Sequence, residues 1–214
     1  MTWWRGYPVY CAHAVAAALV VMMLATTVAL FAGAGVALRA LGFSSNAVLN
    51  GELWRILSYG VVNPPSVSFA LEVVMLVWFG REVEKALGRT PFLQLSAGIY
   101  LVKPLLFTAV GAWFGASFSG ATLSFPLFVA FATLFPGVPL LFNILAKWAA
   151  LALVGIYGLM AVAERRWDQL ADLAAGCGFA YGFVRFASDG FSLPRIRWPR
   201  DRKSTRLNSS HANI

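Results

Sequence analysis

Residues 78–95, WFGREVEKALGRTPFLQL, join two long apolar runs through a short cluster of charged side chains. Lipid disfavours unpaired charges, so such a cluster is typical of a chain that leaves the bilayer at the end of one helix and returns with the next. We expect Gly80 and its charged neighbours to form a helix end at the membrane surface, where the charges reach water and pair with one another. The charged neighbours are Glu82, Glu84, Lys85 and Arg89.

Composition extends this interpretation to the whole chain. Of its 214 residues, 59% are hydrophobic and only 12% are charged, and the mean hydropathy is +0.71, whereas soluble domains carry roughly 25% charged residues. The formal net charge of +8 comes mainly from basic residues beside apolar runs or in the tail, which indicates a lipid bilayer rather than nucleic acid as the partner. Cys11 and Cys177 have no metal-site spacing, so we expect neither a metal nor another cofactor.

Six apolar runs suit membrane-crossing helices, which need about 20 residues each. The predicted fold class is an all-α membrane protein with six transmembrane helices. The runs cover 12–38, 67–79, 92–113, 121–135, 145–163 and 170–186. The predicted organisation is an N-terminal segment at 1–10, one membrane domain at 11–187, a basic tail at 188–202, and a tail at 203–214 whose abrupt change in composition suggests that it is not native.

Lysine and arginine beside the spans predict the orientation, because loops on the cytoplasmic side carry an excess of both. Both termini are predicted to be cytoplasmic, in a plasma or inner membrane. The cytoplasmic set is Arg81, Lys85, Arg89, Arg195, Arg197, Arg200 and Arg202, and the opposite set is Arg39, Arg55, Arg165 and Arg166.

The segment at 42–66, between the first two spans, is too long for a tight turn and too apolar for a solvated loop. Tryptophan favours the headgroup region of a bilayer. We therefore predict a membrane-embedded first loop that lies in the interface, with Trp54 at headgroup depth.

Five short strings keep a consistent order and spacing along the chain. They are the Trp54-Arg55 pair in the first loop, the run GREVEKALGR at 80–89, LFP at 134–136, AKW at 146–148, and AAGCGFAYG at 174–182. Together they resemble the rhomboid family of intramembrane serine proteases, over residues 51–182. The resemblance implies a six-transmembrane-helix rhomboid-like bundle.

The rhomboid resemblance also implies where catalytic residues would stand. The family uses a serine in Gly-x-Ser-Gly on its fourth helix, a histidine on its sixth, and a His-x-x-x-Asn pair on its second. In this chain Ser68 and Glu72 occupy the positions of that pair, and Ala175 occupies the position of the catalytic histidine. Two registers of the fourth helix stay open, one with Ala121 and the other with Thr122 at the serine position. The dyad is absent, so the resemblance implies a catalytically degenerate member, a pseudoprotease.

Glycines and charges inside the predicted spans give two further expectations. Gly178 and Gly182 are four residues apart, so they should share a helix face that lets a neighbouring helix approach closely. Glu72, Lys103 and Asp172 lie within spans, where a central charge costs about 2.5–3.5 kcal/mol, so they should face the bundle interior and have partners. Glu72 and Lys103 fall at comparable depth on consecutive helices, which predicts an ion pair or hydrogen bond between them.

The leading hypothesis is a rhomboid-like integral membrane protein that binds transmembrane clients without cleaving them. The resemblance implies that such a client enters between the second and fifth helices. One alternative is an active intramembrane serine-type endopeptidase with a relocated nucleophile at Ser119, Thr122 or Ser124, and with Glu72 or Asp172 as an unusual base. A second alternative is a small transporter or proton-conducting protein that uses these two acids.

Overall fold

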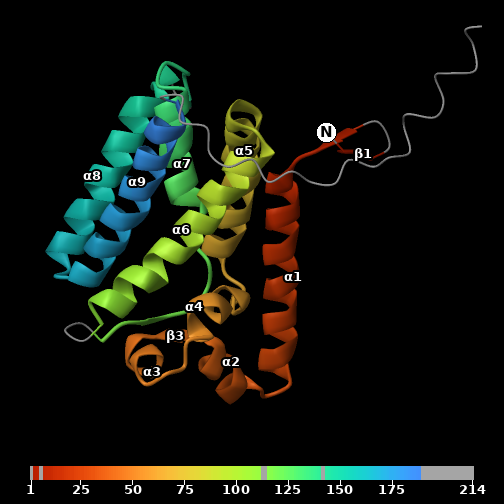
Figure 1. The fold of residues 1–214 in the computed structure, drawn as a ribbon, viewed down its shortest axis with the longest axis vertical. Coiled ribbons are helices and arrows are strands. Elements are labelled where there is room, and N and C mark those ends of the chain that lie inside the picture. The colour runs from red at the N-terminus through yellow and green to blue at the C-terminus, as the bar shows by residue number, and fades with distance from the viewer. Residues whose placement is uncertain (1, 5–6, 112–114, 141–142, 189–214) are drawn as a thin grey trace, which may run out of the picture.

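The computed structural model describes residues 2–4, 7–111, 115–140 and 143–188, which form a mainly helical bundle (Figure 1). The six main helices are α1 (Cys11–Phe31), α5 (Val67–Leu87), α6 (Arg89–Ala109), α7 (Ser124–Leu134), α8 (Ala146–Ala163) and α9 (Trp167–Ser188). The short elements are α2 (Gly35–Leu41), α3 (Ser45–Leu49), α4 (Arg55–Ser58), the 3-10 turn η1 (Tyr59–Val61), and the strands β1 (Thr2–Trp4), β2 (Tyr7–Val9), β3 (Phe43–Ser44) and β4 (Ser117–Phe118). Strands β1 and β2 pair antiparallel, as do β3 and β4. The all-α expectation therefore misses two small strand pairs, and the predicted tails lie outside the described residues except for Ser188.

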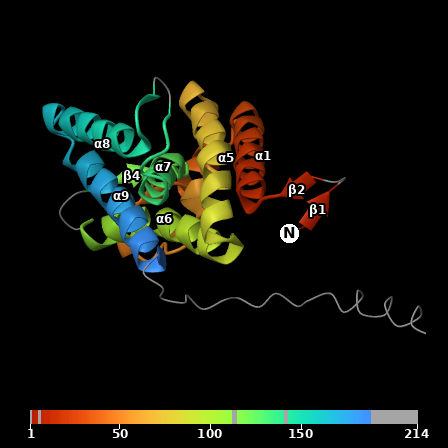
Figure 2. The same cartoon turned by 90° about the horizontal axis from the view of Figure 1, so that it is seen from above.

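Each of the six predicted spans overlaps one of the six main helices. Among the described residues, three helices (α1, α6 and α8) are long and apolar enough to cross a membrane. Helix α5 continues past the predicted end at 79 through the charged cluster, and α7 has only 11 residues. Helix α7 lies between α5 and α8 and also packs against α9 (Figure 2). Its Phe128 and Phe131 rings lie 4.9 and 5.0 Å from the ring of Phe79 on α5, so α7 forms the centre of the core.

The first predicted span, 12–38, is wrong in its last part, because α1 ends at Phe31. Gly33 has a φ angle of +78°, a left-handed conformation that glycine adopts without the strain of a Cβ atom. The chain turns at this residue, and α2 leaves the line of α1 (Figure 1). Apolar residues continue through the turn, so hydropathy alone did not mark the break.

The loop between α1 and α5 is held by Arg55. Its guanidinium donates to the carbonyl oxygens of Arg39 at 2.9 Å and Gly42 at 2.7 Å, and it pairs with Glu52 at 2.6 Å. The Arg55 side chain is mostly buried, whereas Trp54 is exposed. Arg55 therefore has a structural role in the loop. Trp54 is exposed beside it, and its place at headgroup depth stays a prediction.

The charged cluster at the end of α5 has an exposed part and a buried part. Glu82 pairs with Arg81 at 2.9 Å and with Lys85 at 2.8 Å on the surface, as expected. The expectation of water contact is wrong for Glu84, which is only 3% exposed. Its Oε2 atom accepts a hydrogen bond of 2.9 Å from the backbone N–H of Ala12 in the first turn of α1, where N–H groups have no acceptor within the helix. Glu84 therefore caps α1.

Helix α9 packs through a different face from the one that the sequence predicts. Gly178 and Gly182 are exposed, and nothing lies within 4 Å of the point where a Cβ atom would stand on either. Gly176 and Ala180 are buried instead, and the Cβ position of Gly176 is 3.1 Å from Pro126 of α7. The predicted packing face is wrong because a shift of two residues rotates a helix by about 200°.

Gly176→Leu is expected to lower the free energy of unfolding by about 1–2 kcal/mol, because the new side chain would meet Pro126 in a filled interface. Gly178→Leu is the matched control on the same helix, and its expected effect is within about 0.5 kcal/mol. Unfolding of the two purified proteins in detergent measures the difference. A larger loss for Gly178→Leu would mean that the buried face of α9 has been assigned wrongly.

Candidate functional site

The N-terminal end of α7 is bound by a carboxylate from α5. Oε1 of Glu72 accepts hydrogen bonds from the backbone N–H groups of Leu123 and Ser124, the latter at 2.8 Å, and Ser124 Oγ donates to Oε2 at 2.6 Å. The first N–H groups of a helix lack acceptors and carry a partial positive charge, which makes them a ready anion site. Glu72 is therefore a built-in anion on this site, which explains how an acid is accommodated in an apolar bundle.

The segment that leads into α7 is bound to the first loop, again through backbone N–H groups that donate to acceptors elsewhere in the chain. The N–H of Gly120 donates to the carbonyl of Tyr59 at 2.9 Å, and the N–H of Ala121 donates to Asn63 Oδ1 at 3.3 Å. Asn63 is 2% exposed and also donates to the carbonyl of Gly60 at 2.6 Å. Two N–H groups therefore bond to the first loop and two bond to the carboxylate of Glu72. In all, four backbone N–H groups at or just before the start of α7 have acceptors within the chain.

The sequence did not single out Asn63 as a site residue. A usable signal was present, because Asn63 is an amide directly before Pro64 and Pro65 in an apolar segment. Prolines cannot donate a backbone hydrogen bond and the residue before a proline is held extended, so a polar side chain there often bonds a neighbouring backbone. The partner in α7 could not be identified without the fold.

The positions that the rhomboid resemblance assigns to a catalytic dyad do not form one. Ser68 and Thr122 are exposed, Ala121 is buried, and Ala175 is partly buried on α9. A serine or threonine nucleophile needs a base within hydrogen-bond reach. Among the described residues the one histidine is His13 in the first turn of α1, near the C-terminal end of α5, whereas α7 starts near the N-terminal end of α5 (Figure 1).

Of the three alternative nucleophiles, Ser119 and Thr122 are exposed ahead of α7, and only Ser124 meets an acid. The contact of Ser124 Oγ with Glu72 has the distance that a nucleophile and base require. Transfer of the hydroxyl proton, however, would leave a neutral acid facing two backbone N–H donors at a helix start, where a negative charge is favoured. The geometry therefore suits a helix cap better than a nucleophile and its base.

Lys103 pairs with Asp172, so the predicted pair of Glu72 and Lys103 is wrong. Nζ of Lys103 on α6 lies 2.8 Å from Oδ2 of Asp172 on α9, and 4.6 Å from the centre of the Phe118 ring. The two charged side chains are 18% and 33% exposed. The prediction compared depth along the helices alone, whereas the direction of each side chain around its helix axis decides the partner. Helix α6 presents Lys103 to α9, and α5 presents Glu72 to α7.

Two tyrosines join the first loop to α6. The hydroxyl of Tyr59 donates to the carbonyl of Tyr100 at 2.6 Å, and the two rings stack with centroids 4.7 Å apart. The hydroxyl of Tyr100 donates to the carbonyl of Leu57 and accepts from the N–H of Gly60 at 3.2 Å. Burial raises the pKa of Tyr59 well above its usual range, so the phenol stays neutral and keeps its role as a donor at physiological pH.

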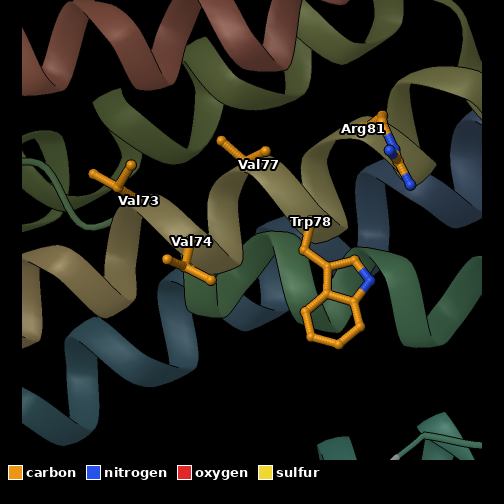
Figure 3. Close-up of a pocket in the computed structure, with 5 residues that line it drawn as sticks. All are labelled: Val73, Val74, Val77, Trp78 and Arg81. Carbon is orange, nitrogen blue, oxygen red and sulfur yellow. The ribbon is translucent and has the colours of Figure 1, made fainter.

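A shallow groove runs along the outer face of α5. It has a volume of about 380 Å³, and its lining residues are Val73, Val74, Val77, Trp78 and Arg81 (Figure 3). Val73 and Val74 are adjacent and Val77 lies on the next turn, the indole of Trp78 projects from the helix, and Arg81 stands at one end (Figure 3). Such a surface suits a lipid chain or an apolar helix.

The site has to be interpreted from its own geometry. No family model, curated protein or solved structure matches the chain. In the part of the chain that the structure describes, no three His, Cys, Asp or Glu side chains gather where they could hold a metal ion. The chemistry of the site consequently rests on the bound carboxylate of Glu72 and on the pair of Lys103 and Asp172.

Proposed function

We propose that this chain is a rhomboid-like membrane protein that binds transmembrane segments of other proteins without cleaving them. The observation that carries the proposal is the contact between Glu72 and the start of α7. A serine protease keeps donors beside its nucleophile free for the oxyanion that develops on the substrate. Here the chain's own carboxylate occupies the N–H groups of Leu123 and Ser124, so a substrate carbonyl would have to displace a charged group.

The groove on α5 supports the binding part of the proposal. Val74 and Trp78 are 57% and 54% exposed, and valine side chains lose little rotamer freedom when another surface covers them. Helices associate in membranes through close van der Waals packing. On α5 the valines line a hollow and the projecting Trp78 forms a ridge, so another helix can pack against both. A client helix is the kind of partner that uses this shape.

The non-catalytic part of the proposal predicts no reaction with a fluorophosphonate. The protein in lipid vesicles should show no adduct on Ser119, Thr122 or Ser124 by mass spectrometry, because the acid that Ser124 meets, Glu72, is already bonded to two backbone N–H groups of α7. An active serine hydrolase in the same vesicles is the positive control. An adduct on Ser124 in the folded protein, lost in Ser124→Ala, would favour the protease alternative instead.

Client binding can be tested separately with a photocrosslinking amino acid at Val74. The matched control is Leu159, which is 72% exposed on α8 and outside the groove. We expect distinct protein crosslinks from Val74 in native membranes and mainly lipid adducts from Leu159. Equal protein crosslinking from both positions would indicate random collision in the bilayer and would contradict a client site on α5.

The transporter alternative has no observation in its favour. It requires acids that are free to bind and release a proton or solute. Glu72 is bonded to the start of α7, and Asp172 is paired with Lys103, so each acid joins two helices.

A further inference from the structure

The turn after α1 opens a second groove, between the end of α1, α2 and the pair of strands β3 and β4. Its volume is about 570 Å³, within the range of roughly 300–1,000 Å³ that is typical of small-molecule sites. Leu30, Leu38 and Val62 contribute to an apolar wall. This wall extends from the end of a helix that is apolar enough to cross a membrane.

Arg39 is the one basic side chain among the described residues that line this groove. Arg39 is exposed in the last turn of α2, and its Nε donates to the carbonyl of Gly35 at 3.3 Å. Within the described residues none of the ion pairs includes Arg39. The exposed Ser117 and Ser119 line the same groove. A guanidinium with hydroxyl groups beside it has the donors that a phosphate group requires.

The neighbourhood of the groove is apolar as well as exposed. Phe31 and Val36 are 96% and 75% exposed next to the turn that forms the groove. Such side chains are stable in contact with hydrocarbon rather than water. A guest can therefore arrive sideways from the bilayer, with its chain already in lipid.

We propose that this groove binds one anionic phospholipid, with its phosphate on Arg39 and one acyl chain along Leu30, Leu38 and Val62. A soluble phosphate ester would satisfy the guanidinium and leave the apolar wall in contact with water. A zwitterionic lipid would fill the wall but bring its own cation close to Arg39, which weakens the attraction. Only an anionic amphiphile satisfies both parts of the groove. This site does not depend on the proposed client role.

The experiment uses the full chain in detergent after removal of lipid. Native mass spectrometry and thermal unfolding follow titration with phosphatidylglycerol, with phosphatidylcholine of the same chains, and with soluble glycerol phosphate. Phosphatidylglycerol should bind about tenfold more tightly than phosphatidylcholine, and glycerol phosphate should not bind. Arg39→Gln should lower the phosphatidylglycerol affinity about tenfold, to the level of phosphatidylcholine.

Arg165→Gln is the matched control, because Arg165 is an exposed arginine in the turn between α8 and α9 and lies outside the groove. It removes the same charge and should leave lipid binding unchanged. Equal losses in Arg39→Gln and Arg165→Gln would overturn the proposal, and so would glycerol phosphate binding as tightly as the lipid. Leu38→Trp places a larger side chain in the groove and keeps Arg39. It therefore tests lipid binding even if Arg39→Gln fails to fold. Unchanged phosphatidylglycerol binding in Leu38→Trp would overturn the proposal.

Discussion

Asp172→Ala is expected to lower the free energy of unfolding by about 2–3 kcal/mol. The substitution leaves Lys103 charged between α6 and α9, and within the part of the chain that the structure describes its remaining partner is the Phe118 ring, 4.6 Å away. Removal of one member of a fully buried ion pair typically costs about 3–5 kcal/mol. The expected loss is smaller here because Asp172 is 33% exposed, which lets water screen part of the uncompensated charge.

A double-mutant cycle separates this pair from other effects of the two substitutions. Lys103→Ala combined with Asp172→Ala should be less destabilising than the sum of the single variants by at least about 1 kcal/mol. Asp168→Ala is the control, since Asp168 and Arg166 form an exposed pair at 3.3 Å, and its expected effect is within about 0.5 kcal/mol. Simple additivity of the two substitutions would show that the pair contributes nothing.

A second double-mutant cycle tests the ion pair of Glu72 and Lys103 that the sequence predicted. Lys103→Ala and Glu72→Ala should be additive, because the two side chains contact different helices. Coupling between them comparable to that of Lys103 with Asp172 would restore the predicted pair of Glu72 and Lys103.

Hydropathy predicted where the long helices lie, because burial in lipid or in a helical core selects apolar residues over the whole length of a helix. It did not predict where α1 ends, because Gly33 breaks the helix by its backbone conformation while the surrounding residues stay apolar. Hydropathy also did not predict that the helix at the centre of the core, α7, is the shortest of the six main helices. Those features depend on which helices pack together.

The charges within the predicted spans were expected to have partners, and Glu72, Lys103 and Asp172 each have one in the structure, where all three are partly buried. The identity of the partners was not predictable. Glu72 binds backbone N–H groups, and every residue except proline has one, so no residue type in α7 could mark the contact. Lys103 and Asp172 are 69 positions apart, and their approach depends on how α6 and α9 are rotated.

Two acids on α5, one buried and one partly buried, each bind the N-terminal end of a neighbouring helix. Glu84 binds the first turn of α1, and Glu72 binds the first turn of α7. The two acids are 12 residues, or about 18 Å, apart along α5. A helix N-terminus supplies both hydrogen-bond donors and a partial positive charge, so each contact compensates an acid. Glu84 also has a basic partner, because its Oε1 atom pairs with Arg89 at 3.6 Å. Helix α5 therefore fixes the starting points of two neighbouring helices.

Glu72→Ala is expected to lower the free energy of unfolding by about 3 kcal/mol or more. Two backbone N–H groups, those of Leu123 and Ser124, would lose their acceptor in the partly buried interior, and each unsatisfied group costs about 1–3 kcal/mol. The helix would also lose a favourable charge at its start. Glu72→Gln is the matched control, since its carbonyl oxygen can still accept from the same donors, and its expected loss is about 1 kcal/mol.

A small carboxylate should partly restore the Glu72→Ala protein, because the substitution leaves two N–H donors and the space of the removed side chain at the start of α7. The midpoint of thermal unfolding should rise with formate concentration, and formate at about ten times its Kd should recover about 1.4 kcal/mol. The original protein and Glu72→Gln should not respond beyond the effect of sodium chloride at equal ionic strength. Equal stability of the Ala and Gln variants, with no response to formate, would mean that the carboxylate of Glu72 does not hold α7. The strongest argument against oxyanion binding at Ser124 would then be lost.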